Sequence, residues 1–262
     1  MYDLTAITSE VIRRAPRIIV LGVEKIGKST FAAGSPGAIF LPIKGEEGID
    51  EIAVNKTLVC ESSTDVFGWL SSLGNSGQES GTIVIDSTST LEPIISAEIC
   101  SAANAPSINE NSLAFGVGMD RSLVVWRKII ECLDALRAHR GMGSILIGHV
   151  KAKRFDDPGG ASYDQWQWDV HQKVASLLYR WSDSILFCNK KTAVQSEQLG
   201  FSKDNTRNTA VDIAPGQHFL YTQGRPSHPG GGRGVYGQLP YELPLGWDHF
   251  SAAVAAQMKA QE

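Results

Sequence analysis

A nine-residue stretch near the start of the chain, GVEKIGKST, constrains the fold more than any other part of the sequence. It follows directly on the apolar run IIVL and fits the pattern G-x-x-x-x-G-K-S through Gly22, Gly27, Lys28 and Ser29. In this P-loop pattern the glycines let backbone N–H groups turn inward and hold phosphate oxygens at the start of a helix. The sequence therefore predicts a buried strand, a phosphate-binding loop and a helix over residues 28–33.

Each residue of the motif has a chemical task in this prediction. The Lys28 ammonium reaches the β- and γ-phosphates of a nucleotide, and the Ser29 hydroxyl binds the Mg²⁺ that accompanies them. The alternative, a glycine-rich turn without a ligand, is disfavoured because the stretch lies between a predicted strand and a predicted helix. The residues predicted to bind the nucleotide are Gly22, Val23, Glu24, Lys25, Ile26, Gly27, Lys28, Ser29, Thr30 and Asp86.

A P-loop site also needs a carboxylate on the metal side, which usually ends a neighbouring buried strand. The run TIVIDS supplies this carboxylate, Asp86. Taken alone, Asp86 fits equally well as a cap of the following helix, since Asp and Ser are both good N-caps. In a chain with a P-loop we interpret it as the metal-side carboxylate. The predicted Mg²⁺ ligands are therefore Ser29 and Asp86.

Short apolar runs alternate along the chain with segments of helical spacing. The runs are rich in β-branched residues, which is typical of strands buried in a mainly parallel sheet covered by helices. This alternation predicts an α/β fold. The predicted strands cover residues 17–21, 38–41, 82–85, 144–147 and 184–187, and the predicted helices cover residues 64–73, 91–102, 122–138 and 170–181.

Two stretches lack periodicity, residues 103–118 and 151–163, and we expect both to be irregular. Beyond residue 189, short strands are predicted over 192–195 and 218–222, as a β extension, before a stretch rich in Gly, Pro and Arg. The predicted organisation is an N-terminal extension of residues 1–16, one core of residues 17–222, and a C-terminal tail of residues 223–262 that packs on the core or on a neighbouring subunit.

Composition limits the partners of the protein. With 262 residues, of which 42% are hydrophobic, the chain can bury a full core. The net charge of −4 gives no overall positive field, so any nucleic-acid binding has to rest on a local basic patch. The four cysteines form no C-x-x-C pair, and no run reaches the roughly 18 apolar residues of a membrane span. We expect a cytoplasmic protein without a membrane partner.

Six segments resemble a known family in their order along the chain: GVEKIGKSTFAAG, FLPIKGEEGIDEI, IVIDSTSTLEPI, AFGVGMDRS, ILIGHVKAKRFDDPGG and WSDSILF. They look like the phage-encoded nucleotide-binding ATPases with a RecA-like core, a group that includes phage single-strand-annealing and recombination proteins. The resemblance covers about residues 17–187, and the tail TQGRPSHPGGGRGVYGQLPYELPLGWDHF is similar to the family's C-terminal signature except at residues 230–232. It implies a RecA-like P-loop NTPase, ATP as the nucleotide, and the cytoplasm of a bacterial host.

The resemblance also implies catalytic roles. In RecA-like ATPases an acidic residue just after the second strand orients the attacking water, and the matching residue is Glu46, with Glu47 beside it. The alternative is a solvated acidic helix start that includes Asp50 and Glu51. His149 ends the strand ILIGH, where such proteins place a γ-phosphate sensor, although a lone His there is more often only hydrogen-bonded. The predicted catalytic residues are Glu46, Lys28 and His149.

Cations and aromatic residues follow His149, in the place where RecA-like proteins carry a DNA-binding loop. Positive charges on phosphates, and rings that stack on bases at about 1–3 kcal/mol each, would hold a single strand. The residues predicted to bind DNA are Lys151, Lys153, Arg154 and Phe155, followed by the aromatic residues Tyr163, Trp166 and Trp168. Asp156 and Asp157 weaken this prediction, and a Trp pair at i, i+2 also fits one buried face of an edge strand. Residues 104–118, the place of the other DNA loop, contain no Lys or Arg.

Three arginines near the C-terminus, Arg207, Arg225 and Arg233, are candidates for an arginine finger that acts across a subunit interface. The resemblance around TQGRP favours Arg225, and solvated surface charge is the alternative for each of the three.

The function predicted from these residues and the resemblance is a Mg²⁺-dependent ATPase that acts on single-stranded DNA in phage recombination, annealing or replication. We expect a homo-oligomer, with a single-strand-binding or other recombination protein as a candidate partner. The alternatives are a nucleotide-dependent switch or assembly module with weak hydrolysis, and a P-loop small-molecule kinase, for which no Arg-rich lid is evident. The lack of a guanine-reading N-K-x-D sequence favours ATP.

Overall fold

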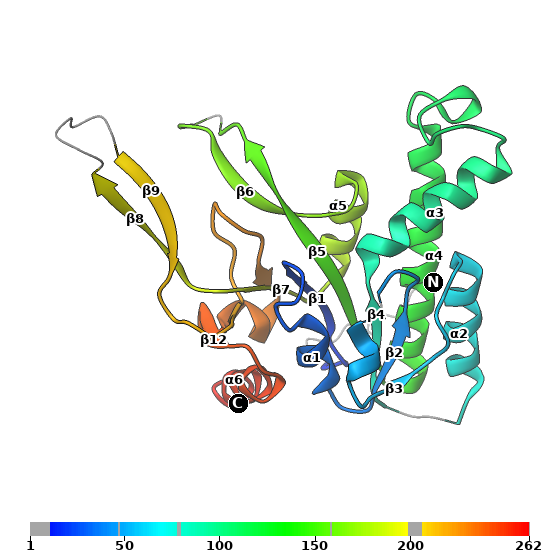
Figure 1. Cartoon of the computed structure of the whole chain (residues 1–262). Helices are drawn as coiled ribbons and strands as arrows, with labels where there is room; N and C mark the ends of the chain where they lie inside the picture. The colour runs from blue at the N-terminus through cyan, green and yellow to red at the C-terminus, as the bar shows by residue number, and fades with distance from the viewer. Residues whose placement is uncertain (1–10, 47, 78–79, 158, 199–205, 262) are drawn as a thin grey trace, which may run out of the picture.

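The computed structural model describes residues 11–46, 48–77, 80–157, 159–198 and 206–261. Its centre is a twisted sheet with helices on both faces (Figure 1). Five parallel strands form the middle of this sheet in the order β7-β1-β5-β4-β2. They are β1 (Arg17–Gly22), β2 (Ala38–Pro42), β4 (Thr82–Asp86), β5 (Gly143–Phe155) and β7 (Ser184–Asn189). The predicted α/β class with a mainly parallel sheet is confirmed, and all five predicted core strands are present.

Shorter strands extend the sheet at its two edges. β3 (Asn55–Lys56) pairs in parallel with β2 at one edge. At the other edge β10 (Phe219–Tyr221) and β11 (Gly231–Gly232) pair antiparallel with β7, and β12 (Glu242–Pro244) pairs antiparallel with β10. β10 corresponds to the predicted strand 218–222, whereas β11 and β12 lie in the segment that was predicted as a tail.

Alternate residues of the central strands face opposite sides of the sheet, and both sides are buried. Ile19 and Leu21 of β1 belong to the larger core, which includes Trp126, whereas Ile18 and Val20 belong to a second core on the other face. Burial on both faces explains why the strands are apolar runs without polar alternation. On this face the strands are covered by the helix after the P-loop and by the C-terminal helix.

The predicted helices are all present, with ends that differ by a few residues. α1 (Lys28–Ala33) follows the P-loop, and the larger core is covered by α2 (Ser63–Asn75), α3 (Thr88–Ala102), α4 (Val117–Arg140) and α5 (Gln172–Trp181). Short 3₁₀ turns occur at η2 (Gly48–Glu51), η3 (Asn111–Leu113) and η4 (Gly234–Gln238). None of the helices in the described ranges is both long and apolar enough to cross a membrane.

The prediction of an irregular stretch over residues 151–163 is wrong at its two ends, whereas the described residues between 155 and 163 belong to no helix or strand. β5 continues beyond the sheet as far as Phe155 and pairs antiparallel with β6 (Tyr163–Trp168), from Val150 opposite Trp168 to Phe155 opposite Tyr163. This hairpin projects from the sheet (Figure 1). The strand was not predicted because the projecting part of β5 is exposed and carries charged residues. An exposed strand needs no apolar run.

β9 (Thr206–Asp212) and α6 (Trp247–Lys259) are elements of the C-terminal part that the sequence did not predict. β8 (Thr192–Gln198), which includes the predicted strand 192–195, pairs with β9 (Thr206–Asp212) in a separate two-stranded sheet that forms a second projecting arm (Figure 1). α6 (Trp247–Lys259) packs through Phe250 and Val254 into the second core. The segment predicted as a tail therefore covers one face of the chain's own sheet.

Candidate functional site

The P-loop joins β1 to α1 in a conformation that requires glycine at two positions. Gly27 has φ of +106°, a left-handed conformation that side chains other than glycine rarely adopt, and it caps the N-terminus of α1. Gly22 has no room for a side chain, since a Cβ atom there would lie 2.6 Å from the carbonyl oxygen of Cys188. The loop is thereby held close to β7 and opens towards the carboxyl ends of the strands.

The Lys28 side chain is buried within the P-loop, with 5% of its surface exposed. Its ammonium group donates to the carbonyl oxygens of Gly22 at 3.0 Å and Val23 at 2.8 Å, and lies 3.4 Å from Nδ1 of His149. Burial lowers the pKa of Lys28, and the nearby negative charges of Asp86 and Glu46 oppose that shift. The three contacts show that the ammonium already points into the loop.

Ser29 and Asp86 meet although 57 residues separate them in the chain. The Ser29 hydroxyl donates to Oδ2 of Asp86 at 2.6 Å, and Asp86 is 5% exposed at the end of β4. Burial raises the pKa of Asp86, and the hydrogen bond from Ser29 opposes this. A buried carboxylate thus faces the hydroxyl of the P-loop, which is the pairing expected from the sequence.

Glu46 lies in the loop after β2, and one oxygen of its carboxylate forms hydrogen bonds with two side chains. Oε1 accepts from the Ser87 hydroxyl at 2.6 Å and is 2.8 Å from Nε2 of His149. Because Nδ1 of His149 faces the Lys28 ammonium, which can only donate, these contacts place the ring proton on Nε2. Burial raises the pKa of Glu46, but the hydrogen bonds from His149 and Ser87 outweigh it and keep the pKa below its usual value.

Strand order brings these groups together. β5 lies between β1 and β4, so its residue His149, paired with Gly22 in register, sits between the P-loop and the Asp86 strand. A cavity of about 780 Å³, the largest among those of the described residues, opens at this point. It is lined by Glu24, Lys25, Gly27, Lys28, Ser29, Thr30, Gly45, Glu46, Gly48, Glu51, Ile52, Asp86, Thr90 and His149.

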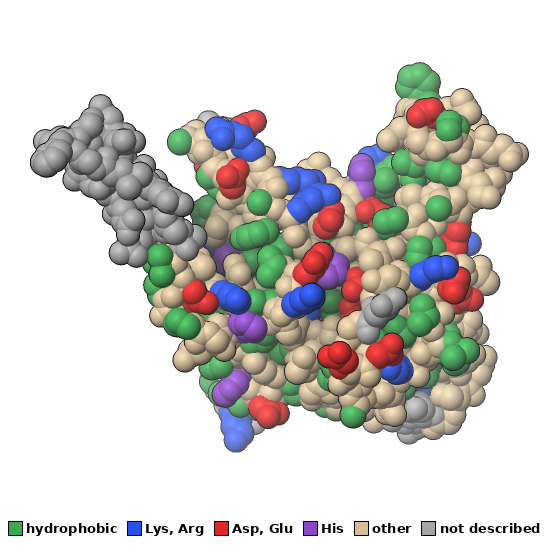
Figure 2. All heavy atoms as spheres, viewed as in Figure 1, with side chains coloured by type: hydrophobic (Ala, Val, Ile, Leu, Met, Phe, Trp, Pro, Cys, Tyr) green, Lys and Arg blue, Asp and Glu red, His purple; other side chains and the backbone are tan. Residues whose placement is uncertain are grey.

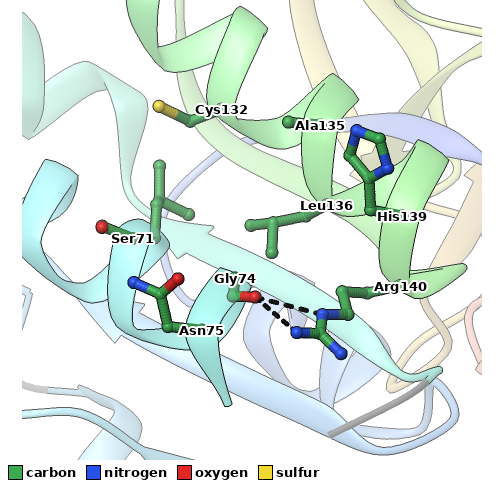
Figure 3. A pocket seen from close by; sticks show the side chains of 9 residues that line it. Ser71, Gly74, Asn75, Cys132, Ala135, Leu136, His139 and Arg140 are labelled. Carbon is green, nitrogen blue, oxygen red and sulfur yellow. Dashed lines mark hydrogen bonds between the residues drawn. The ribbon is translucent and has the colours of Figure 1, made fainter. Parts of the chain in front are cut away.

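A second cavity, between α2 and α4, has a different character (Figure 3). It measures about 400 Å³ and is walled by apolar groups such as Leu70 and Leu136. The Arg140 guanidinium at its rim is bound within the protein, because it donates to the carbonyl oxygen of Gly74 at 2.7 and 3.1 Å. Its described lining contains neither a carboxylate nor a P-loop residue, so the candidate site is the larger cavity.

The residues predicted to bind DNA lie on the projecting part of β5 instead of on a loop. Lys151, Lys153 and Arg154 are exposed. Lys151 forms an ion pair with Asp169, and Arg154 lies 3.8 Å from Asp156. Figure 2 shows Lys and Arg side chains gathered over this hairpin, with Asp and Glu side chains among them.

The aromatic residues of the hairpin have unequal environments. Trp168 is 3% exposed and packs against Tyr179, with ring centroids 5.4 Å apart, so it is a core residue. Trp166 and Tyr163 are half-buried, and the ring of Tyr163 lies 5.4 Å from that of Phe155. Only part of the aromatic run is therefore accessible to a ligand.

The arginines proposed as fingers do not line the large cavity of their own chain. The Arg225 guanidinium stacks on the ring of Tyr241, 3.6 Å from its centroid. Arg233 donates to the backbone oxygen of Arg180. The side chain of Arg207 and the whole of Glu47 lie outside the described residues.

Ser87 is a residue near the site for which the sequence predicted no role. It caps α3, because its hydroxyl accepts from the backbone N–H of Thr90 at 3.4 Å. Its contact with Glu46 depends on a loop 41 residues away, for which the sequence carries no signal.

Comparisons with known proteins identify the family of the chain. Residues 14–234 match the model of the family described as AAA domain. Among solved structures, the crystal structure of the RadB recombinase is similar over 79% of this chain and 81% of its own, with 12% sequence identity and a TM-score of 0.40. No curated protein sequence matches the chain. Because the family match covers most of the chain and includes the P-loop, Asp86 and Glu46, the chain belongs to the AAA domain family.

Proposed function

We propose that the protein is a Mg²⁺-dependent ATPase that acts on single-stranded DNA. The observation that carries the ATPase half is the convergence on one cavity of a P-loop lysine, a buried hydroxyl–carboxylate pair and a hydrogen-bonded glutamate. Each of these groups comes from a different segment, and the strand order places them around the same space. Phosphoryl transfer depends chiefly on such positioning and on charge stabilisation.

The residues present fit a magnesium ion. Mg²⁺ prefers hard oxygen ligands and is usually held by one or two protein oxygens together with phosphates and water. Ser29 Oγ and Asp86 Oδ2 are 2.6 Å apart and face the cavity, so both would serve as its ligands. When bound, the ion would neutralise charge that develops on the phosphate oxygens.

Lys28, Glu46 and His149 would carry the remaining roles in hydrolysis. The Lys28 ammonium, now 3.4 Å from His149 Nδ1, would exchange this contact for the β- and γ-phosphates. Glu46 Oε1 already holds two partners, so Oε2 is the oxygen left to accept a hydrogen bond from the attacking water. His149 touches both Lys28 and Glu46, a position that suits a sensor of the γ-phosphate.

Two substitutions test the ATPase half. Lys28→Ala removes the phosphate contact, so we expect nucleotide binding and hydrolysis both to be lost. Glu46→Gln keeps the size of the side chain but weakens the orientation of water, so we expect binding to remain while phosphate release falls by at least about 100-fold, the usual contribution of general acid–base groups. The measurements are titration with a fluorescent ATP analogue and phosphate release. Retained turnover in Glu46→Gln would remove Glu46 from the mechanism.

The single-stranded DNA half is supported by the exposed cations of the β5–β6 hairpin, which continues from His149. Recombination, annealing or replication in a phage, and the cytoplasm of its bacterial host, are proposed on the family resemblance of the sequence. We further propose that the protein assembles with itself and that Arg225 acts across the interface, which would require it to leave Tyr241. Phosphate release with and without single-stranded DNA tests the coupling of the two halves.

The same measurement separates the ATPase from its alternatives. A switch or assembly module would bind ATP with little turnover, and a kinase would need an acceptor molecule. The position of Glu46 beside the P-loop cavity favours hydrolysis over a pure switch.

A further inference from the structure

Two adjoining cavities form a groove along α5, on the face that the helix turns towards the hairpin and α4. The first, of about 350 Å³, lies between α5 and the β5–β6 hairpin, and the second, of about 510 Å³, lies between α5 and α4. Gln172 and Ser176 of α5 line both cavities, so the two adjoin along these residues and together make one surface region. We call it the α5 groove. It is separate from the P-loop cavity, with which it shares no lining residue.

The α5 groove is basic in a protein whose net charge is −4. Lys153 lines the first cavity, and Arg127, Lys173 and Arg180 line the second, whereas the described linings contain no Asp or Glu. Among the described residues, Lys173 pairs with Asp120 at 3.3 Å, while Lys153, Arg127 and Arg180 form no ion pair with a carboxylate. Such a concentration of unneutralised cations attracts a polyanion.

His171, at the N-terminus of α5, reports the same positive surroundings. Burial lowers its pKa, and the charges of Lys173 and Lys153 lower it further. These two lysines come from α5 and from the hairpin, and in the described part of the chain the one carboxylate hydrogen-bonded to His171 is that of Glu92, which accepts from its backbone N–H at 2.8 and 2.9 Å.

Aromatic side chains lie near the cations at the end of the α5 groove that is formed by the hairpin. Phe155 is 36% exposed and lines the first cavity together with the half-buried Trp166. Cations that contact phosphates, combined with rings on which bases can stack, are the pairing found in grooves that bind single strands. A duplex keeps its bases stacked on one another and offers such rings little surface.

We propose that the α5 groove is a binding surface for single-stranded nucleic acid, with Arg127 and Arg180 contacting its phosphates and Phe155 and Trp166 contacting its bases. This inference rests on the proposed function and adds residues of α4 and α5 that the sequence did not indicate. The strand would run from the hairpin over α5 to α4. It would therefore lie against β5, the strand that also carries His149.

The test measures binding of the full-length protein to a fluorescent oligo-dT of about 20 nucleotides, at several salt concentrations. The variant is Arg127→Gln combined with Arg180→Gln. Its matched control is Lys128→Gln, the next residue on α4, which is exposed but lines neither cavity. Unchanged binding of the ATP analogue and an unchanged melting temperature show that each variant is folded.

We expect the double variant to bind oligo-dT at least about tenfold more weakly than the control. The loss of two phosphate contacts should also lower the slope of log K against log salt by about 1.4, from about 0.7 for each contact to a single strand. Phe155→Ala should weaken binding with little change in that slope, because it removes stacking and leaves the charges.

Three outcomes overturn the inference. If the wild type binds oligo-dT but the double variant binds as well as Lys128→Gln, the groove is wrong and the proposed function stands. If the wild type binds no single-stranded DNA, the DNA half of the proposed function fails together with the groove. If the double variant loses affinity only for duplex DNA, the assignment to single strands is wrong.

Discussion

The role of Ser87 depends on one contact, its hydrogen bond to Glu46. Ser87 is fully buried, and its hydroxyl donates to Glu46 Oε1 at 2.6 Å, the same oxygen that faces His149. Two donors that bind one carboxylate oxygen fix the orientation of the carboxylate, and they thereby also fix the direction in which its other oxygen points. Ser87 is therefore a positioning residue for Glu46, since its described side-chain hydrogen bonds are to Glu46 and Thr90 and none is to a P-loop residue.

At this scale we expect Ser87→Ala to lower turnover about tenfold with nucleotide affinity unchanged. The reason is that a hydrogen bond to a charged group contributes about 1.5 kcal/mol or more, and about 1.4 kcal/mol corresponds to tenfold in rate. The measurement is phosphate release by Ser87→Ala, Glu46→Gln and the double variant.

The double variant separates positioning from simple structural damage. If Ser87 acts through Glu46, adding Ser87→Ala to Glu46→Gln should cost little further turnover, because the effects of coupled residues do not add. Ser62→Ala is the control, since Ser62 caps α2 in a capping box, does not line the P-loop cavity and should affect stability alone. A tenfold loss of turnover that persists in the Glu46→Gln background would rule out this role.

At the scale of elements, the P-loop helix depends on a helix from the other end of the chain. α1 has only six residues and cannot be stable alone. Phe31 of α1 packs against Trp247 and Phe250 of α6, with ring centroids 5.4 and 5.8 Å apart. A Cβ atom on Gly34 would lie 2.6 Å from Cβ of Trp247, so the two helices are in close contact.

Phe250→Ala should therefore weaken both the fold and the nucleotide site. Phe250 is 2% exposed, and truncation of a buried aromatic ring costs about 3–5 kcal/mol. We expect a loss of about 3 kcal/mol in the free energy of unfolding, measured by urea denaturation, and several-fold weaker binding of the ATP analogue. His249→Ala, at the exposed neighbouring position, should change neither quantity. Full nucleotide affinity in a destabilised Phe250→Ala would show that α6 does not support the P-loop.

At the scale of the whole molecule, an ion-pair network joins elements at the amino ends of β1 and β7, whereas the site lies at the carboxyl ends of the strands. Asp183, just before β7, binds Arg17 of β1 at 2.7 Å and Arg137 of α4 at 3.1 Å. Arg17 also contacts Asp134 of α4 at 3.3 Å. Burial raises the pKa of Asp183, but the hydrogen bonds and charge of Arg17, helped by Arg137, outweigh it and leave the pKa below its usual value.

The network predicts a stability that depends on pH. Because the folded-state pKa of Asp183 lies below its unfolded value, its stabilising effect is full above the unfolded pKa of about 3.9 and is lost as pH falls through the folded pKa. Asp183→Asn should lower the free energy of unfolding at pH 7 by about 2–3 kcal/mol, slightly less than for a fully buried pair. The difference from wild type should shrink below about pH 4. Urea denaturation across this range measures it, and a difference independent of pH would contradict the assignment.

The sequence by itself determined the features that depend on neighbouring residues. The P-loop, the five core strands and the carboxylate at the end of β4 were predictable because glycine spacing and β-branched apolar runs act within a few residues. Continuous apolar runs also indicated a parallel sheet, since only strands covered on both faces need them.

Only the tertiary structure decided how distant segments meet. Strand order places His149 between the P-loop and Asp86, and the contact of Ser87 with Glu46 follows from where the loop after β2 ends. The hairpin after His149 was not predicted, because exposed strands need no apolar pattern. The packing of α6 on α1 was not predicted either, because the sequence of α6 does not indicate which helix it contacts. The physical reason is that burial and hydrogen bonding between segments far apart in the chain leave no local signature in either segment.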